Sequence, residues 1–124
     1  MISNQAANPA VNPKRVGEPQ TLGFLLLDNF TLISLASAIE PLRMANQLAG
    51  SELYRWYTLT QDGLPVRASD GVQVTPDASM HAPLSLEWVV VCGGVGPQHS
   101  VTREHVRWLQ SQSRKLRRLG SVCT

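Results

Sequence analysis

The sequence predicts a single α/β domain built on a mainly parallel sheet. Short apolar runs of strand length alternate with segments in which apolar residues recur at helical spacing. Two of the runs, 21–27 and 88–92, are continuously apolar, as is typical of strands covered on both faces. Strands that alternate with helices form parallel βαβ units. A chain of 124 residues can bury one hydrophobic core, so we expect one such domain.

The first half of the chain is expected to hold a leader, a buried strand and a helix. Residues 1–20 are rich in Asn, Gln, Ala and Pro without periodicity, which predicts a disordered leader. After the strand over 21–27, a helix is expected over 31–48, with Thr31 as its N-cap and Gly50 as its stop. Its apolar stripe consists of Leu32, Leu35, Ile39, Leu42 and Ala45.

The second half is expected to continue the alternation of strands and helices. The elements are, in order, a strand over 53–60, a small hairpin of 66–68 and 72–74, an irregular segment over 75–87, the strand over 88–92, a helix over 102–115 and a last strand over 119–123. The helix is amphipathic, and Val106, Leu109 and Leu116 lie on the side that we expect to face the core.

Composition excludes several classes of protein. Hydrophobic residues make up 43% of the chain, which is typical of a globular domain. No apolar run approaches the roughly 20 residues that span a membrane, and the first residues lack a signal-peptide pattern. Two cysteines are too few for a disulfide framework. We therefore expect a cytoplasmic protein.

The net charge of +2 is unevenly distributed. Residues 103–124 contain six Lys or Arg and one acidic residue, and Arg114, Lys115, Arg117 and Arg118 form a cluster. Such a cluster could contact nucleic acid. The alternative is a solvated helix end whose cations offset the helix dipole. The second interpretation is favoured, because no aromatic interleaving or helix-turn-helix pattern accompanies the cluster.

Three features are expected to meet at the carboxyl edge of the sheet, where open α/β sheets bind ligands. The thiol of Cys123 ends the last strand, and its alternative role is that of a small buried hydrophobe. Gly93 and Gly94 follow a buried strand and could point N–H groups at an anion, or could only turn the chain. Glu40 lies next to the apolar stripe of the first helix, and could reach this edge or face solvent.

The remaining chemistry-bearing residues indicate no metal or cofactor site. His81, His99 and His105 are scattered, and none has a metal-ligand spacing with the cysteines. Cys92 and Cys123 could lie on neighbouring strand ends and oxidise together, although a cytoplasmic setting argues against a structural disulfide. We therefore predict neither a cofactor nor a metal ion.

Four segments occur in an order and at distances that resemble a known family. They are Phe24–Asp28, Ala38–Asn46, Val89–Gly94 and Gly120–Thr124. Together they resemble the amidotransferase-like (ThiJ/PfpI superfamily) domain at the N-terminus of AraC-type transcriptional regulators. The resemblance covers residues 21–124 and is closest to regulators of glycine betaine, carnitine and related amine catabolism.

The resemblance implies a flavodoxin-like (class I glutamine amidotransferase-like) fold with helices on both faces of the sheet. It also implies a non-catalytic pocket for a small amine or amino-acid-like effector, in a protein expected to form a homodimer. The residues expected at the pocket are Cys123, Glu40, Gly93, Gly94, Asn29 and Phe30. An aromatic ring such as Phe30 could contact a quaternary ammonium, although packing in the core is its alternative role.

Two departures from the family bear on function. Peptidase-like relatives have a histidine after the elbow cysteine, whereas Thr124 stands here, so hydrolase chemistry is not expected. The family also continues past this cysteine into further elements and a DNA-binding helix-turn-helix domain. We therefore expect residues 21–124 to be a truncated sensor domain that meets DNA only through a domain outside this chain. The alternative is a cysteine-dependent hydrolase or glyoxalase-like enzyme of the same superfamily.

Overall fold

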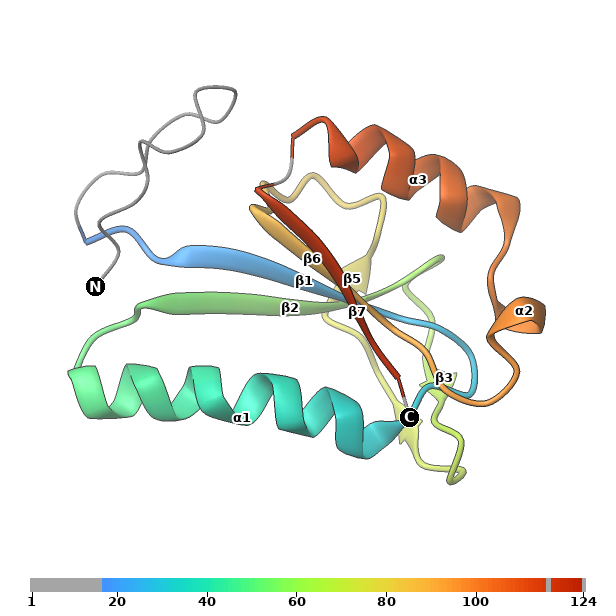
Figure 1. Cartoon of the computed structure of the whole chain (residues 1–124), viewed down its shortest axis with the longest axis horizontal. Helices are drawn as coiled ribbons and strands as arrows, with labels where there is room; N and C mark the ends of the chain where they lie inside the picture. The colour runs from blue at the N-terminus through green and yellow to red at the C-terminus, as the bar shows by residue number, and fades with distance from the viewer. Residues whose placement is uncertain (1–16, 116, 124) are drawn as a thin grey trace.

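A computed structural model describes residues 17–115 and 117–123 and shows a sheet between helices (Figure 1). The strands are β1 (Gln20–Leu26), β2 (Tyr54–Thr60), β3 (Val66–Arg67), β4 (Gln73–Val74), β5 (Ala78–Ser79), β6 (Trp88–Cys92) and β7 (Arg118–Val122). The helices are α1 (Leu32–Ala49), α2 (Pro97–Ser100) and α3 (Arg103–Ser113). Five strands form one parallel sheet in the order β5-β2-β1-β6-β7, and β3 and β4 pair separately. The predicted parallel α/β fold is confirmed.

β1 lies at the centre of the sheet because its side chains are apolar on both faces. Leu22, Phe24 and Leu26 pack into one buried cluster with residues of α1, whereas Leu25 packs into a second cluster that includes Trp108 of α3. The two helices lie on opposite sides of the sheet (Figure 1). Helices therefore cover both faces, as the sequence predicts.

α1 has the ends that the sequence predicts. Thr31 is its N-cap, and Gly50 ends it in the left-handed conformation, with φ of 66°, which glycine adopts without steric cost. Pro41 lies inside the helix. The buried or half-buried side chains include all five of the predicted apolar stripe, namely Leu32, Leu35, Ile39, Leu42 and Ala45. The helix thus lies on the sheet with the predicted face inward.

The face that α3 turns to the core differs from the prediction. Trp108 and His105 are the buried residues of this helix, whereas Val106 is 43% exposed. Leu109 packs at the edge of the cluster as expected, and the side chain of Leu116 lies outside the described residues. The prediction failed because it counted His105 as polar, although its ring nitrogen accepts a hydrogen bond from the Thr102 backbone.

Two shorter segments also differ from the sequence reading. The segment expected to be irregular contains β5, which is paired with β2 because Asp77 N donates to Thr58 O at 2.9 Å and Met80 N to Thr60 O at 2.8 Å. The expected leader falls mostly on residues 1–16, outside the described residues, and Gln20 already belongs to β1.

One of the four residues in the basic cluster near the end of the chain is partly buried. Arg117 is 13% exposed and its guanidinium lies 3.6 Å from the Glu87 carboxylate, whereas Arg118 begins β7. Arg114 and Lys115 follow the end of α3. Within the described ranges, no helix combines the length and the apolar character needed to cross a bilayer.

Candidate functional site

The carboxyl ends of β1, β6 and β7 meet at one edge of the sheet. From β1 the chain continues to β2 on one side, whereas β6 lies on its other side, so the strand order reverses between β1 and β6. Ligands in open α/β sheets bind at such a switch point. The turn Asp28–Thr31, the Gly93–Gly94 pair and Cys123 occupy this edge.

The turn after β1 and the glycines after β6 are hydrogen-bonded to each other. Thr31 N donates to Gly93 O at 3.0 Å, and Val95 N donates to Asn29 O at 3.1 Å. A β-carbon on Gly94 would clash with Asn29 O and would lie only 2.8 Å from Thr31 N. Only glycine fits at this position, so Gly94 lets the two turns approach and fixes their relative position.

The structure places Cys123 against these glycines. Its Sγ donates to Gly94 O at 3.8 Å, and a β-carbon on Gly93 would lie 3.9 Å from the same sulfur. The residue is exposed. The N–H of Gly93 donates to Val122 O at 3.0 Å, so this predicted anion donor is already used within the sheet edge.

The two cysteines have different environments, and neither forms a disulfide. Cys92 is fully buried, and burial raises the pKa of its thiol to about 12. Its sulfur donates to Val90 O at 3.9 Å. A thiol with so high a pKa is inert at neutral pH. Of the two, Cys123 is the one that a ligand or reagent can reach.

An open groove of about 570 Å³ runs between the start of α1 and the end of β7. It is lined by Ile33, Ser34, Ser37, Ala38, Ser121, Val122 and Cys123. Three hydroxyls and one thiol therefore face the groove beside apolar side chains, and none of its lining side chains carries a fixed charge. Sequence reasoning missed the serines, although Ser34 and Ser37 are three residues apart near the start of a helix that follows a buried strand.

The other predicted pocket residues lie away from this groove. The Glu40 carboxylate is 56% exposed and accepts hydrogen bonds from Arg43, with Nε and Nη2 each 2.9 Å away. Phe30 has no exposed surface and packs in the core on the α1 side, which is the alternative role given to it above. Asn29 is exposed at the turn with φ of 62°, and contributes its carbonyl to the contact with Val95. None of these three side chains lines the groove.

No group of three or more His, Cys, Asp or Glu residues is arranged to hold a metal ion in the described part of the chain. His81 contacts Glu104, and His105 contacts Thr102. His99 lies in α2. His81 and His105 thus make these contacts at the start of α3 rather than with Cys123.

Known proteins share the sequence and the fold of this chain. No protein-family model matches the chain. The HTH-type transcriptional regulator GbdR of Pseudomonas aeruginosa is 66% identical over 116 residues, which cover 94% of this chain and 31% of that protein. An AraC family transcriptional regulator from Pseudomonas putida matches in structure with a TM-score of 0.73 at 27% identity, over 83% of this chain and 64% of that chain. A ThiJ/PfpI family protein from Pseudomonas syringae matches with a TM-score of 0.68 at 16% identity, over 94% and 47%.

The chain has an α/β fold similar to that of an AraC family transcriptional regulator and of a ThiJ/PfpI family protein. The resemblance read from the sequence, to the amidotransferase-like domain of AraC-type transcriptional regulators, is confirmed by these matches. The chain is a close homologue of a regulator of this kind, and it spans about a third of that regulator's length.

Proposed function

We propose that this chain is a ligand-sensing domain of an HTH-type transcriptional regulator and that the groove beside Cys123 receives its effector. The observation that carries the proposal is the position of the groove, which lies at the carboxyl edge of the sheet between α1 and β7. Its exposed thiol contacts a glycine turn that is itself fixed against the end of β1. A ligand held here would touch both α1 and the end of β7, and could therefore bias their relative positions.

The lining of the groove supports a small amine or amino-acid-like effector. Ser34, Ser37 and Ser121 offer neutral hydrogen-bonding groups, and Ile33, Ala38 and Val122 offer apolar surface. A ligand with a net charge would find no opposite fixed charge among these side chains, and such a mismatch disfavours binding. A compact molecule whose charges balance internally, with methyl or methylene groups, fits both kinds of surface.

The proposed function is binding without turnover. A nucleophilic thiol needs a base or another activating group. Thr124 follows Cys123 in the sequence, His81 and His105 contact Glu104 and Thr102, and the Glu40 carboxylate binds Arg43.

Calorimetry of the chain with glycine betaine, carnitine and basic amino acids tests the proposal. Glycine betaine or carnitine, whose charges balance internally, is expected to bind and to raise the unfolding temperature, since a ligand at a hundred times its Kd stabilises a native protein by about 2.7 kcal/mol. The basic amino acids carry a net positive charge and are expected to bind less tightly. Ser37→Leu fills the groove and is expected to weaken binding at least tenfold. Ala36→Leu is the matched control, because Ala36 is exposed on the same helix but does not line the groove. Equal affinity in the two variants, or no binding by the wild-type chain, contradicts the proposal.

The second candidate function is a cysteine-dependent hydrolase or glyoxalase-like activity. The exposed thiol of Cys123 at the groove favours it. Turnover of methylglyoxal that is lost in Cys123→Ser would establish this activity and overturn the proposal of binding alone. Unchanged methylglyoxal with the wild-type chain is the expected result.

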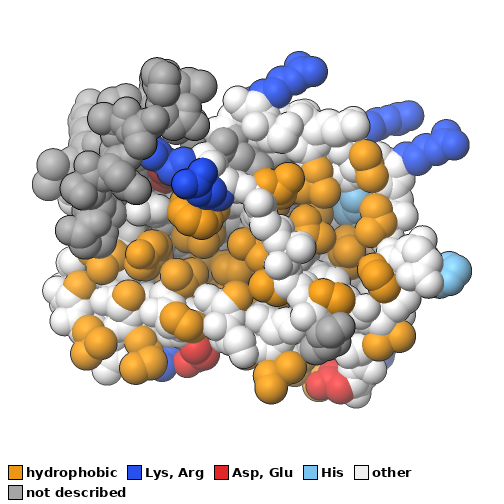
Figure 2. Space-filling view, in the orientation of Figure 1, with side chains coloured by type: hydrophobic (Ala, Val, Ile, Leu, Met, Phe, Trp, Pro, Cys, Tyr) orange, Lys and Arg blue, Asp and Glu red, His pale blue; other side chains and the backbone are white. Residues whose placement is uncertain are grey.

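We further propose that the regulator acts as a homodimer and contacts DNA through another part of the protein. Exposed apolar side chains on α1 support association, namely Ile33, Met44 and Leu48, which are 69%, 50% and 82% exposed. Hydrophobic side chains gather on the face that α1 and β7 present in Figure 2. Light scattering over a range of protein concentrations is expected to show a dimer that Leu48→Glu weakens, and a variant that associates as the wild type does would exclude α1 as the interface.

A further inference from the structure

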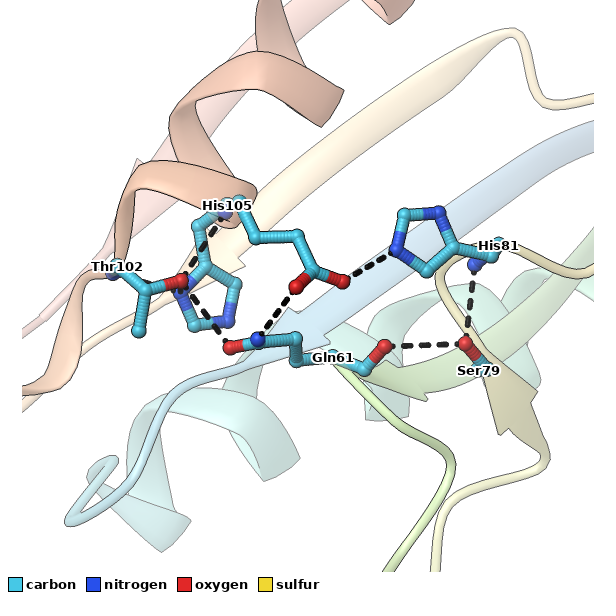
Figure 3. Close-up of polar contacts among 6 residues, drawn as sticks. Gln61, Ser79, His81, Thr102 and His105 are labelled. Carbon is cyan, nitrogen blue, oxygen red and sulfur yellow. Dashed lines mark hydrogen bonds and ion pairs between the residues drawn. The ribbon is translucent and has the colours of Figure 1, made fainter.

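A network of hydrogen-bonded polar side chains from separate segments holds the first turn of α3 (Figure 3). Gln61 follows β2, His81 follows β5, and Thr102 and Glu104 lie at the start of α3. Three segments that are distant in sequence are therefore joined on this face of the sheet. None of these residues lines the groove beside Cys123, so this polar network is separate from the groove.

The direction of each hydrogen bond in this polar network follows from which side-chain atoms can donate and which can accept. The Thr102 hydroxyl donates to Gln61 Oε1 at 3.1 Å, and Gln61 Nε2 donates to Glu104 Oε1 at 3.0 Å. Glu104 Oε2 lies 2.6 Å from His81 Nε2, which must donate because an ionised carboxylate only accepts.

His105 closes the start of the helix in a different way. Its backbone N–H donates to Thr102 Oγ1 at 3.2 Å, while the Thr102 N–H donates to His105 Nδ1 at 3.0 Å. This is a capping box in which histidine stands where Glu or Gln is usual. Because Nδ1 must accept, the imidazole has to be neutral, with its proton on Nε2.

We propose that the start of α3 is an acid-sensitive clasp, closed by neutral His105 and opened when this imidazole takes up a proton. His105 Nδ1 also lies 3.1 Å from Thr102 Oγ1, which could accept a hydrogen bond from a proton there. A proton on Nδ1 would nevertheless remove the acceptor of the Thr102 N–H, so this half of the capping box would break. The new charge would also be buried, because His105 is only 5% exposed. Acid therefore loosens the cap at the start of α3.

The surroundings of His105 favour the neutral form. Burial lowers its pKa, and the negative charge of Glu104 opposes this effect as the smaller contribution. Beyond Glu104 lies His81, while the end of β2 contributes the neutral Gln61. The sheet face under α3 contributes apolar side chains, which pack with Trp108.

The sign of the pH effect follows from proton linkage. An unfolded chain protonates this histidine near its ordinary value of 6.5, whereas the folded chain resists protonation until a lower pH. The unfolded state thus binds more protons between the two values, and stability falls as the pH drops below 6.5. One proton changes the opening equilibrium by at most about tenfold per pH unit.

Hydrogen exchange of the α3 amides between pH 7.5 and 5, corrected for intrinsic rates, tests the clasp on the full chain. Protection of the first turn is expected to fall with acid by up to about tenfold per pH unit. His105→Gln keeps an acceptor for the Thr102 N–H but does not titrate, so its protection should stay level. His81→Gln keeps a donor to Glu104 and should retain the wild-type fall. The same acid-dependent loss in His105→Gln as in the wild type would overturn the proposal.

A second measurement needs no variant. The imidazole nitrogen shifts of the wild-type chain at pH 7.5 are expected to show His105 with an unprotonated Nδ1. A neutral His105 that carries its proton on Nδ1 would contradict the capping box and, with it, the clasp. The nitrogen shifts of the wild-type chain test whether Nδ1 of His105 accepts a hydrogen bond, even if a variant at this buried position does not fold.

Discussion

Gly94 lies directly against the backbone of Asn29, with no room for a side chain between the two turns. A β-carbon at Gly94 would also come within 2.8 Å of both the nitrogen and the hydroxyl of Thr31. Because backbone atoms cannot move aside as a flexible side chain can, we expect Gly94→Ala to destabilise the fold by at least about 3 kcal/mol. Urea unfolding followed by circular dichroism measures this loss.

Gly93→Ala is the matched control for that substitution. A β-carbon at Gly93 meets only the Cys123 sulfur, at the ordinary contact distance of 3.9 Å. Its free energy of unfolding should therefore change by less than about 1 kcal/mol. If both variants lose the same free energy of unfolding, the close approach of Gly94 to Asn29 is not the reason why a side chain at Gly94 is costly.

Asn46 joins the end of α1 to the start of β2 with three hydrogen bonds. Its Oδ1 accepts from Leu53 N at 2.8 Å and from Tyr54 N at 3.0 Å, and its Nδ2 donates to Tyr54 O at 2.9 Å. We expect Asn46→Ala to lower the free energy of unfolding by about 2 kcal/mol, since each such bond contributes roughly 0.5–1.5 kcal/mol. Asn46→Asp keeps the acceptors and should lose about half as much. Gln47→Ala, at the exposed neighbouring position, should change little, and an equal loss there would refute a specific role for Asn46.

Because Glu87 and Arg117 form a part-buried ion pair, we expect substitutions at the two positions to have non-additive effects on the free energy of unfolding. Both side chains are 13% exposed, and Nε lies 3.6 Å from Oε2. Removing either partner leaves the other charge part-buried, so Arg117→Met and Glu87→Gln should each cost about 2–3 kcal/mol. The double variant should cost less than the sum of the two. A double-mutant cycle of urea unfolding measures this coupling, and purely additive losses would show that the pair does not act as a unit.

The two thiols predict a simple labelling result. At pH 8 only about one Cys92 thiol in ten thousand is ionised, given its pKa of about 12. A thiol reagent should therefore label the native chain once, at exposed Cys123, and twice in denaturant. Cys123→Ser should abolish rapid labelling of the native chain, whereas Cys92→Ser should leave it unchanged. Rapid labelling of native Cys123→Ser would contradict the burial of Cys92.

Much of the fold could be predicted because the main elements have local patterns. The apolar runs of β1 and β6 indicate buried strands, and the stripe of α1 indicates its inward face. β5 has no such signal, since its two residues form a strand only through hydrogen bonds that flank them, to Thr58 and Thr60. The inward face of α3 was misread because burial of His105 depends on a partner, Thr102, that a hydropathy pattern does not show.

The candidate site was only partly predictable for a related reason. The contact of Cys123 with the glycine pair follows from the shared edge of parallel strands, which a sequence can indicate. The sequence of α1, in contrast, does not show which of its sides faces β7, because the position of β7 is set by β6. The serines of α1 at the groove could therefore be found only in the structure, and a role for Glu40 at the thiol stays a prediction.

The central position of β1 has a consequence for how the chain is made. A ribosome releases the N-terminal part first, so β1 can pair with β2 soon after α1 has formed. The other edge of β1 has no partner strand until β6 is synthesised, because the β6 residues that pair with Leu22–Leu26 leave the ribosome much later. Until then an apolar strand edge is open to other nascent chains. The sheet can therefore be completed around β1 only after β6 has been synthesised.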